Sequence, residues 1–201
     1  MVQRLSFVSV AAMLLFTGCQ GGDVADGVDA AVEAATPQTA ESELDILPLD
    51  QVKASQSGEV SQTIATTQIT VTYDRPVARG RELFGGIVAY GQIWNPGAND
   101  ATMIALSQPV TINGTSLPAG RYSIWAIPDP NEWTVIFSRA ADVFHEPYPG
   151  EEQDALRLSV APTSGDHMET LAFYFSMVEK KDAELRLHWG ETVVPLQIRV
   201  P

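Results

Sequence analysis

Positively charged residues are scarce in this chain of 201 residues. Lysine and arginine number 12 against 25 aspartate and glutamate residues, so the formal net charge is −13 at pH 7. Proteins that bind nucleic acids take much of their affinity from clustered lysine and arginine side chains that contact phosphates. The composition therefore excludes nucleic acid as a partner, and the same acidic surface repels anionic lipid head groups.

Cysteine and histidine are also scarce. Cys19 is the single cysteine, and the chain contains no His-Glu-x-x-His, Cys-x-x-Cys, nucleophile-elbow or phosphate-loop motif. The three histidines, His145, His167 and His188, lie in separate segments without the spacing of metal ligands. We therefore predict no metal site, no cofactor and no disulfide, and we expect the histidines to be solvated.

Long hydrophobic runs are missing apart from residues 5–16. This run is shorter than a helix that crosses about 30 Å of hydrocarbon, but it suits the core of a signal peptide. It ends at Phe16-Thr17-Gly18-Cys19, which resembles the site where bacterial lipoproteins are cleaved and lipidated. We interpret residues 1–18 as a signal peptide and Cys19 as the lipidation site; an ordinary secreted protein is the alternative. The resemblance, with Gln20 after the cysteine, implies the outer membrane of a bacterial cell envelope.

Residues 19–58 lack aromatic side chains and most of the apolar residues that a core requires. After Cys19, eight acidic residues stand against one lysine. Such a segment cannot bury enough apolar surface to offset the entropy lost on ordering. We interpret it as an acidic tether, so that the protein contacts the membrane through the lipid anchor only.

Residues 59–201 have the pattern of an all-β domain. Ile69, Val71 and Tyr73 alternate with threonines, as in a strand with one buried face, and Asn113-Gly114 is typical of a type I′ hairpin turn. The candidate strands are residues 59–64, 68–73, 102–107, 110–112, 115–117, 122–127, 133–138, 155–161, 170–178, 183–189 and 192–200. Further turns are expected at 129–131, 180–182 and 190–191, and one brief helix at 80–88. About ten short strands with little helix predict an antiparallel β-sandwich or a jelly-roll-like fold.

Seven short blocks in this part of the chain resemble a known family. The blocks are residues 73–76 (YDRP), 80–85 (GRELFG), 90–94 (YGQIW), 97–102 (GANDAT), 118–123 (PAGRYS), 132–137 (EWTVIF) and 154–157 (DALR). In this order they resemble the DUF2911 family of bacterial, mostly exported proteins, from about residue 57 to residue 200. The resemblance implies an all-β exported domain and carries over no established activity. The chain departs from the family pattern at Asn95, where an arginine is usual, and at Asp100, where glutamate is more common.

The connection formed by residues 75–101 is the candidate ligand site. It is 27 residues long, and connections of that length are uncommon unless they form a lid or a binding loop. It offers arginine forks, an indole face and short polar side chains, which suit a small polar or anionic ligand such as a sugar-like molecule. The candidate residues are Arg75, Arg81, Trp94, Asn99 and Asp100. The alternative is that these side chains satisfy buried main-chain groups of a long loop.

The sequence favours a cell-envelope lipoprotein that acts as a binding or envelope-interaction module. The alternative is a periplasmic enzyme of hydrolase type, with acid–base chemistry near the 75–102 loop. Its candidate acid–base pairs are Glu169 with His167 and Asp142 with His145. We interpret Asp154 and Arg157, three residues apart, as an ion pair that closes a loop.

Overall fold

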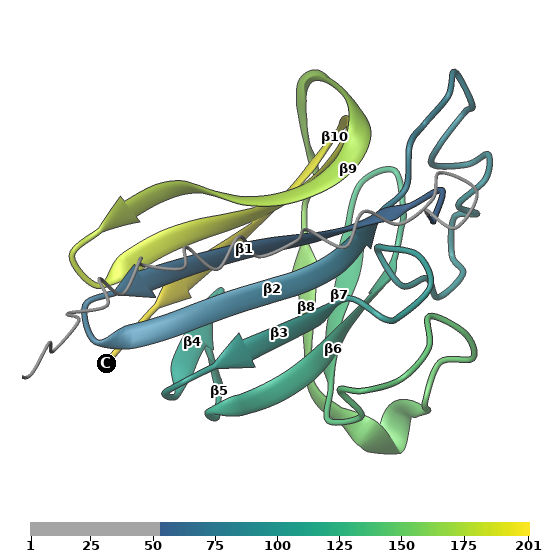
Figure 1. Cartoon of the computed structure of the whole chain (residues 1–201). Helices are drawn as coiled ribbons and strands as arrows, with labels where there is room; N and C mark the ends of the chain where they lie inside the picture. Colours follow the sequence, from purple (N-terminus) through teal and green to yellow (C-terminus); the bar gives the residue numbers. More distant parts are fainter. Residues whose placement is uncertain (1–52) are drawn as a thin grey trace, which may run out of the picture. The chain divides into compact units, whose positions relative to one another are not determined.

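The computed structural model describes residues 53–201, which form two antiparallel β-sheets packed face to face (Figure 1). The larger sheet contains, in spatial order, β1 (Gln56–Ile64), β2 (Thr67–Arg75), β3 (Met103–Leu106), β6 (Gly120–Ile127), β7 (Trp133–Ser138) and β8 (Asp154–Val160). The smaller sheet contains β5 (Thr115–Leu117), β4 (Val110–Ile112), β10 (Asp182–Arg199) and β9 (Thr163–Glu179). A short 3-10 helix, η2 (Glu151–Gln153), precedes β8. The predicted all-β antiparallel sandwich is confirmed.

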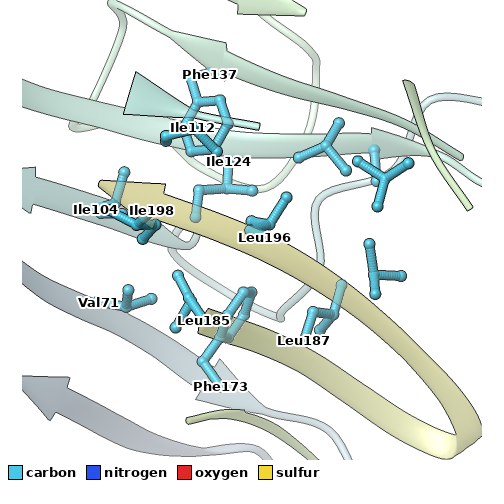
Figure 2. Packing of buried hydrophobic residues seen from close by; sticks show 14 of the residues in the cluster. Val71, Ile104, Ile112, Ile124, Phe137, Phe173, Leu185, Leu187, Leu196 and Ile198 are labelled. Atoms are coloured by element: carbon cyan, nitrogen blue, oxygen red, sulfur yellow. The ribbon is translucent and has the colours of Figure 1, made fainter. Parts of the chain in front are cut away.

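The hydrophobic core lies between the two sheets (Figure 2). Val71 and Ile104 of the larger sheet meet Phe173, Leu185 and Leu196 of the smaller sheet, and all five are almost fully buried. Successive side chains of a strand point to opposite faces, so each strand sends alternate residues into this core. The alternation seen in the sequence of β2 therefore marks its inner face.

The outer face of β6 and β7 is covered as well. Trp125 and Ile136 form a second cluster there with Ala101, apart from the main core. The cover comes from residues 93–101, which precede β3, and from residues 139–148, which follow β7. Strands covered on both faces have nearly continuous apolar sequences, as residues 124–127 of β6 have. These two loops meet over the larger sheet and form the cleft described below.

Turn chemistry predicted several connections correctly. Asn113 and Gly114 both have positive φ, at 47° and 82°, in the hairpin between β4 and β5. Lys180 takes φ of 52° in the turn between β9 and β10, and the Asp129 carboxylate accepts the main-chain N–H of Asn131 at 2.9 Å. These turns depend on residues next to one another in sequence, which is why local preferences predict them.

The helix expected at residues 80–88 is wrong. The segment is a series of turns in which Gly80 and Gly85 have left-handed φ of 67° and 91°. The Val88 N–H donates to the Leu83 carbonyl at 2.8 Å, and the Gly85 N–H donates to the Val88 carbonyl at 2.9 Å. Two left-handed residues five positions apart leave too few consecutive right-handed residues for a helix.

The turn expected at residues 190–191 is also wrong. Gly190 lies inside β10, which continues without interruption from Asp182 to Arg199. The pairing with β9 shifts register on both sides of Gly190, whose φ is 60°. The glycine therefore forms a bulge in a long strand, and β9 extends back to Thr163 to pair with it.

The expected signal peptide (residues 1–18), Cys19 and most of the expected tether (19–58) lie outside the described residues. The first strand begins at Gln56, three residues before the alternation predicted it. Within residues 53–201, no helix has the length and apolar character needed to cross a membrane.

Candidate functional site

A cleft of about 510 Å³ lies between the two loops that cover the outer face of the larger sheet. One wall comes from the segment before β3 and the other from the segment after β7, with β6 beneath them. The lining residues are Ile93, Trp94, Asn95, Trp125, His145, Glu146, Pro147 and Tyr148. Aromatic faces beside a few polar groups are typical of small-molecule sites.

Trp94 separates this cleft from the main core. Its indole stacks on Trp189 with ring centroids 6.1 Å apart and an interplanar angle of 14°, and it meets Phe84 and Trp133 edge to face. Its main chain pairs with Ala126 of β6, with each N–H donating to the other carbonyl at 2.8 Å. Main-chain pairing and aromatic packing therefore fix Trp94 at the cleft wall.

Asn95 holds the loop to the sheet through both ends of its amide. The Nδ2 group donates to the Ile124 carbonyl at 2.7 Å, and Oδ1 accepts the Thr102 N–H at 3.2 Å. The side chain is buried, with 2% of the residue exposed. Asn95 therefore satisfies main-chain groups of the loop and of β6.

His145 lies in the second wall, where the Asn99 main chain holds it. The Asn99 carbonyl oxygen lies 3.0 Å from the His145 main-chain nitrogen and 2.6 Å from ring Nδ1. The imidazole also contacts the exposed ring of Phe144, at a centroid distance of 4.4 Å. Both the backbone and the ring of His145 are therefore tied to the opposite loop.

Tyr148 anchors the same wall to β8. Its hydroxyl donates to the Asp154 carboxylate and accepts from Arg157 at 3.2 Å, and its ring meets Trp125 edge to face at 5.3 Å. Burial, and then the bond to Asp154, raises the pKa of Tyr148 to about 12. The Arg157 Nε atom lies 2.5 Å from Asp154 Oδ2, so the predicted ion pair is confirmed. This network holds the 145–153 segment against the sheet.

The family comparison covers both sheets and both walls of the cleft. The family model described as "Protein of unknown function (DUF2911)" matches residues 55–198. The chain belongs to the DUF2911 family. No curated protein and no solved structure matches the chain.

Arg75 and Arg81 of this DUF2911 domain bind main-chain carbonyl groups outside the cleft. Arg75 Nε donates to the Leu171 carbonyl at 3.2 Å. Arg81 Nε donates to Ala78 at 2.9 Å, and its Nη2 donates to Val77 at 2.7 Å. Neither guanidinium lines the cleft, so the structure separates both arginines from Trp94.

Asn99 and Asp100 lie at the junction of the two loops. The Asn99 side chain donates to the buried Asp74 carboxylate at 2.6 Å. Asp100 is exposed, and its main chain forms an antiparallel bridge with Phe144. Of the five residues that the sequence nominated, only Trp94 lines the cleft.

The proposed acid–base pairs are not assembled in this cleft. His167 Nε2 lies 3.0 Å from Glu169 Oε2, but both side chains are about half exposed and neither lines the cleft. The His167 hydrogen bond, followed by the Arg79 N–H, lowers the pKa of Glu169. Asp142 forms a two-bond ion pair with Arg121 instead of contacting His145.

The expectation that all histidines are solvated is wrong for His188. This residue of β10 is 5% exposed, with Nδ1 at 3.2 Å from the Tyr174 hydroxyl and Nε2 at 3.0 Å from the Asp166 carbonyl. Both partners lie on β9 and compensate the burial of the imidazole. Among residues 53–201, no group of three histidine, cysteine or acidic side chains is placed to hold a metal ion.

Sequence reasoning missed most of the residues that line the cleft. The sequence places Trp125 only inside the predicted strand 122–127, and within residues 145–148 it nominates only His145, as a partner of Asp142. That segment belongs to a connection between β7 and β8 that is long and carries aromatic residues, and long connections often carry function. The length of this connection could have indicated a functional loop. Its contact with residues 93–95 could not be predicted, because no pattern in the neighbouring sequence encodes it.

Proposed function

We propose that this domain is a binding module for a small, uncharged, hydroxyl-rich ligand, such as a neutral sugar, held in the cleft between residues 93–95 and 145–148. The lining of the cleft carries the proposal. Trp94, Pro147 and Tyr148 supply apolar faces, and the His145 imidazole supplies a polar group. A volume of about 510 Å³ falls within the usual range of small-molecule sites.

An uncharged ligand fits these walls better than the anionic one that the sequence left open. The acidic residue Glu146 lines the cleft, whereas Arg75 and Arg81 are engaged with main-chain carbonyls elsewhere. The formal net charge of −13 adds a field that repels anions. Hydroxyl groups need no charged partner, so they suit this environment.

A titration monitored by amide chemical shifts tests the binding proposal. The full chain is labelled with nitrogen-15 and carries Cys19→Ser so that it is exported without acylation. Neutral mono- and disaccharides should shift amides at residues 93–95 and 145–148, and a uronic acid of equal size should bind more weakly. Glu146→Gln should reduce the difference in affinity between the neutral sugars and the uronic acid. Absence of shifts with every neutral sugar, or shifts confined to other surfaces, would overturn the proposal.

We also propose that the chain is a cell-envelope lipoprotein, anchored through Cys19 and exported to the outer membrane. The apolar run at 5–16, the cysteine at its end and the acidic segment that follows support this. In a bacterial host, Cys19→Ser should move the protein from the membrane fraction to the periplasmic fraction, and Gln20→Asp should retain it at the inner membrane. Recovery of the wild-type chain in the periplasmic fraction contradicts the anchor.

A periplasmic enzyme with acid–base chemistry is the second candidate function. The observation in its favour is His145, whose Nδ1 atom is held by a carbonyl in a cleft, as in histidines that act as oriented bases. Chromogenic esters and glycosides of neutral sugars separate the two candidates. Turnover that His145→Gln abolishes while binding persists favours the enzyme, and binding without turnover favours the binding module.

A further inference from the structure

The two loops that form the cleft are joined by a short main-chain ladder. Asp100 and Phe144 form an antiparallel bridge, and the Ala101 N–H donates to the Val143 carbonyl at 2.9 Å. The ladder ends where the His145 N–H donates to the Asn99 carbonyl at 3.0 Å. The position of His145 is therefore set by the loop that carries Asn99.

The same carbonyl determines which ring nitrogen of His145 carries the proton. The Asn99 oxygen lies 2.6 Å from Nδ1, and a carbonyl oxygen can only accept a hydrogen bond. A neutral His145 imidazole therefore has its proton on Nδ1 and a free lone pair on Nε2. Within residues 53–201, Nε2 of His145 has no hydrogen-bond partner, so this acceptor is available in the wall of the cleft.

The direction of the Asn99 carbonyl depends on an uncommon backbone conformation. Asn99 has φ of 56°, which non-glycine residues adopt at a cost unless a local contact compensates. Its side chain supplies that contact by donating to Asp74 Oδ2 at 2.6 Å. The Asp74 residue is 5% exposed, and its carboxylate also accepts from Ser57 Oγ at 2.7 Å and faces Lys53 at 3.8 Å. Ser57 and Lys53 thus hold the Asp74 carboxylate in place independently of its contact with Asn99.

We infer that Asp74 and Asn99 are positioning residues that keep His145 in the Nδ1-protonated tautomer, so that Nε2 accepts a hydrogen bond from a ligand hydroxyl in the cleft. The hydrogen bond from a ligand hydroxyl to Nε2 rests on the proposed function, whereas the tautomer is a property of the protein without ligand. The sequence nominated Asn99 as a direct ligand contact; here it acts through its main-chain carbonyl.

Nitrogen-15 chemical shifts of the histidine rings test the inference directly. The full Cys19→Ser chain is studied in mildly alkaline solution, where an ordinary imidazole is neutral. His145 should show the Nδ1-protonated pattern. His188, whose Nε2 faces the Asp166 carbonyl at 3.0 Å, should show the opposite pattern and is the internal reference.

Variants of the two positioning residues make the test specific. Asn99→Gly keeps the carbonyl and tolerates positive φ but loses the bond to Asp74, so the His145 ring should shift toward a mixture of tautomers while His188 stays unchanged. Asp74→Ala should do the same, and Asp74→Asn should restore part of the wild-type pattern. An Nε2-protonated His145 in the wild type, or a His145 pattern indifferent to Asn99→Gly, overturns the inference.

Ligand affinity then tests the acceptor role separately. His145→Asn keeps a donor near the Asn99 carbonyl but removes the Nε2 position, so neutral-sugar affinity should fall about five- to tenfold, as for loss of one hydrogen bond. His145→Gln can place an amide oxygen near Nε2 and should recover part of the loss. If the tautomer result holds but no neutral sugar binds, the positioning stands and the proposed function fails. Equal sugar affinity in His145→Asn and the wild type overturns the acceptor role alone.

Discussion

Two of the side chains that the sequence nominates as ligand contacts hold the main chain in this protein. Arg75 donates to one main-chain carbonyl and Arg81 donates to two. Long loops carry many main-chain groups that need partners when they are covered. Among residues 53–201, the titratable groups with shifted pKa values are Tyr148, Arg157, Glu169, Glu184 and Arg186. Two of them give direct predictions.

Tyr148→Phe should reduce the loss of stability at alkaline pH. The pKa of Tyr148 is about 12 in the folded protein against 10 for an ordinary tyrosine. The unfolded chain therefore loses this proton first, so the stabilisation is fully present below pH 10 and disappears as the pH rises toward 12. Urea unfolding over this range should show a shallower decline for Tyr148→Phe than for the wild type. Tyr90→Phe, at an exposed position, is the control; a decline equal to that of the wild type in Tyr148→Phe contradicts the prediction.

Glu184→Gln should lower the free energy of unfolding at neutral pH and have little effect on it at acidic pH. Hydrogen bonds from Ser176, and further ones from Arg186 and Gln197, lower the pKa of Glu184 below 4.5. A lowered folded-state pKa gives stability that is present above the unfolded value and lost as the pH falls through the folded value. The variant should lose about 1 kcal/mol at neutral pH and approach the wild type in acid. Denaturant titrations at both pH values measure this, with exposed Glu191→Gln expected to change neither.

At the scale of elements, the long hairpin of β9 and β10 is held by the chain that follows β2. That chain covers part of the β9 edge: Val77 bridges Thr170, and the Ala78 N–H donates to the Glu169 carbonyl at 2.8 Å. The main-chain groups covered in this way cannot pair with another chain. The bulge at Gly190 bends β10 beside this contact, where its backbone approaches Leu83.

Gly190→Ala should destabilise the domain more than the same change at a roomy site. Gly190 has φ of 60°, and the Cβ of an alanine at this position would lie 2.8 Å from Leu83 Cδ1. Gly80 has φ of 67° with no atom within 4 Å of its Cβ position. Gly80→Ala should therefore cost about 1 kcal/mol from left-handed strain alone, and Gly190→Ala about 2 to 3 kcal/mol from strain plus crowding. Equal losses in urea unfolding contradict the role assigned to the bulge.

At the scale of the whole molecule, the two sheets are joined by a hydrogen-bonded side chain as well as by the core. The Tyr73 hydroxyl of β2 accepts the Phe173 N–H at 3.0 Å and donates to the Phe173 carbonyl at 3.3 Å. The two rings also meet edge to face at 5.0 Å. One phenol thus satisfies two main-chain groups of β9 from the opposite sheet.

Tyr73→Phe should lower the free energy of unfolding by about 2 to 3 kcal/mol, because it leaves the buried Phe173 N–H without its partner. Tyr122→Phe is the matched control, since it removes a buried hydroxyl that serves one nearby acceptor, the Pro118 carbonyl at 3.0 Å. The control should cost about 1 kcal/mol. Thermal and urea unfolding measure both, and a Tyr73→Phe variant as stable as Tyr122→Phe contradicts the cross-sheet role.

The sequence by itself determined the class of the fold and most of its strands. Alternation of apolar side chains in β2, the Asn113-Gly114 turn and the succession of short strands between turns are all local features. They identified an antiparallel sandwich, and the ordered blocks identified the DUF2911 family, which the family model confirms. The two local errors, a helix at 80–88 and a turn at Gly190, both arose at glycines with positive φ. Gly80 and Gly85 interrupt the run of right-handed residues that a helix needs, and Gly190 forms a bulge next to Leu83.

Only the tertiary structure decided the composition of the cleft. Residues 93–95 and 145–148 are about fifty positions apart, and they meet because the strand order brings both loops onto the outer face of β6. The alternation of apolar and polar side chains along a strand indicates which face is covered, but it does not indicate which distant loop covers that face. The same reason explains why Asn99 acts on His145 through a carbonyl: the partner of a main-chain group depends on chain placement rather than on the side chain that the sequence displays.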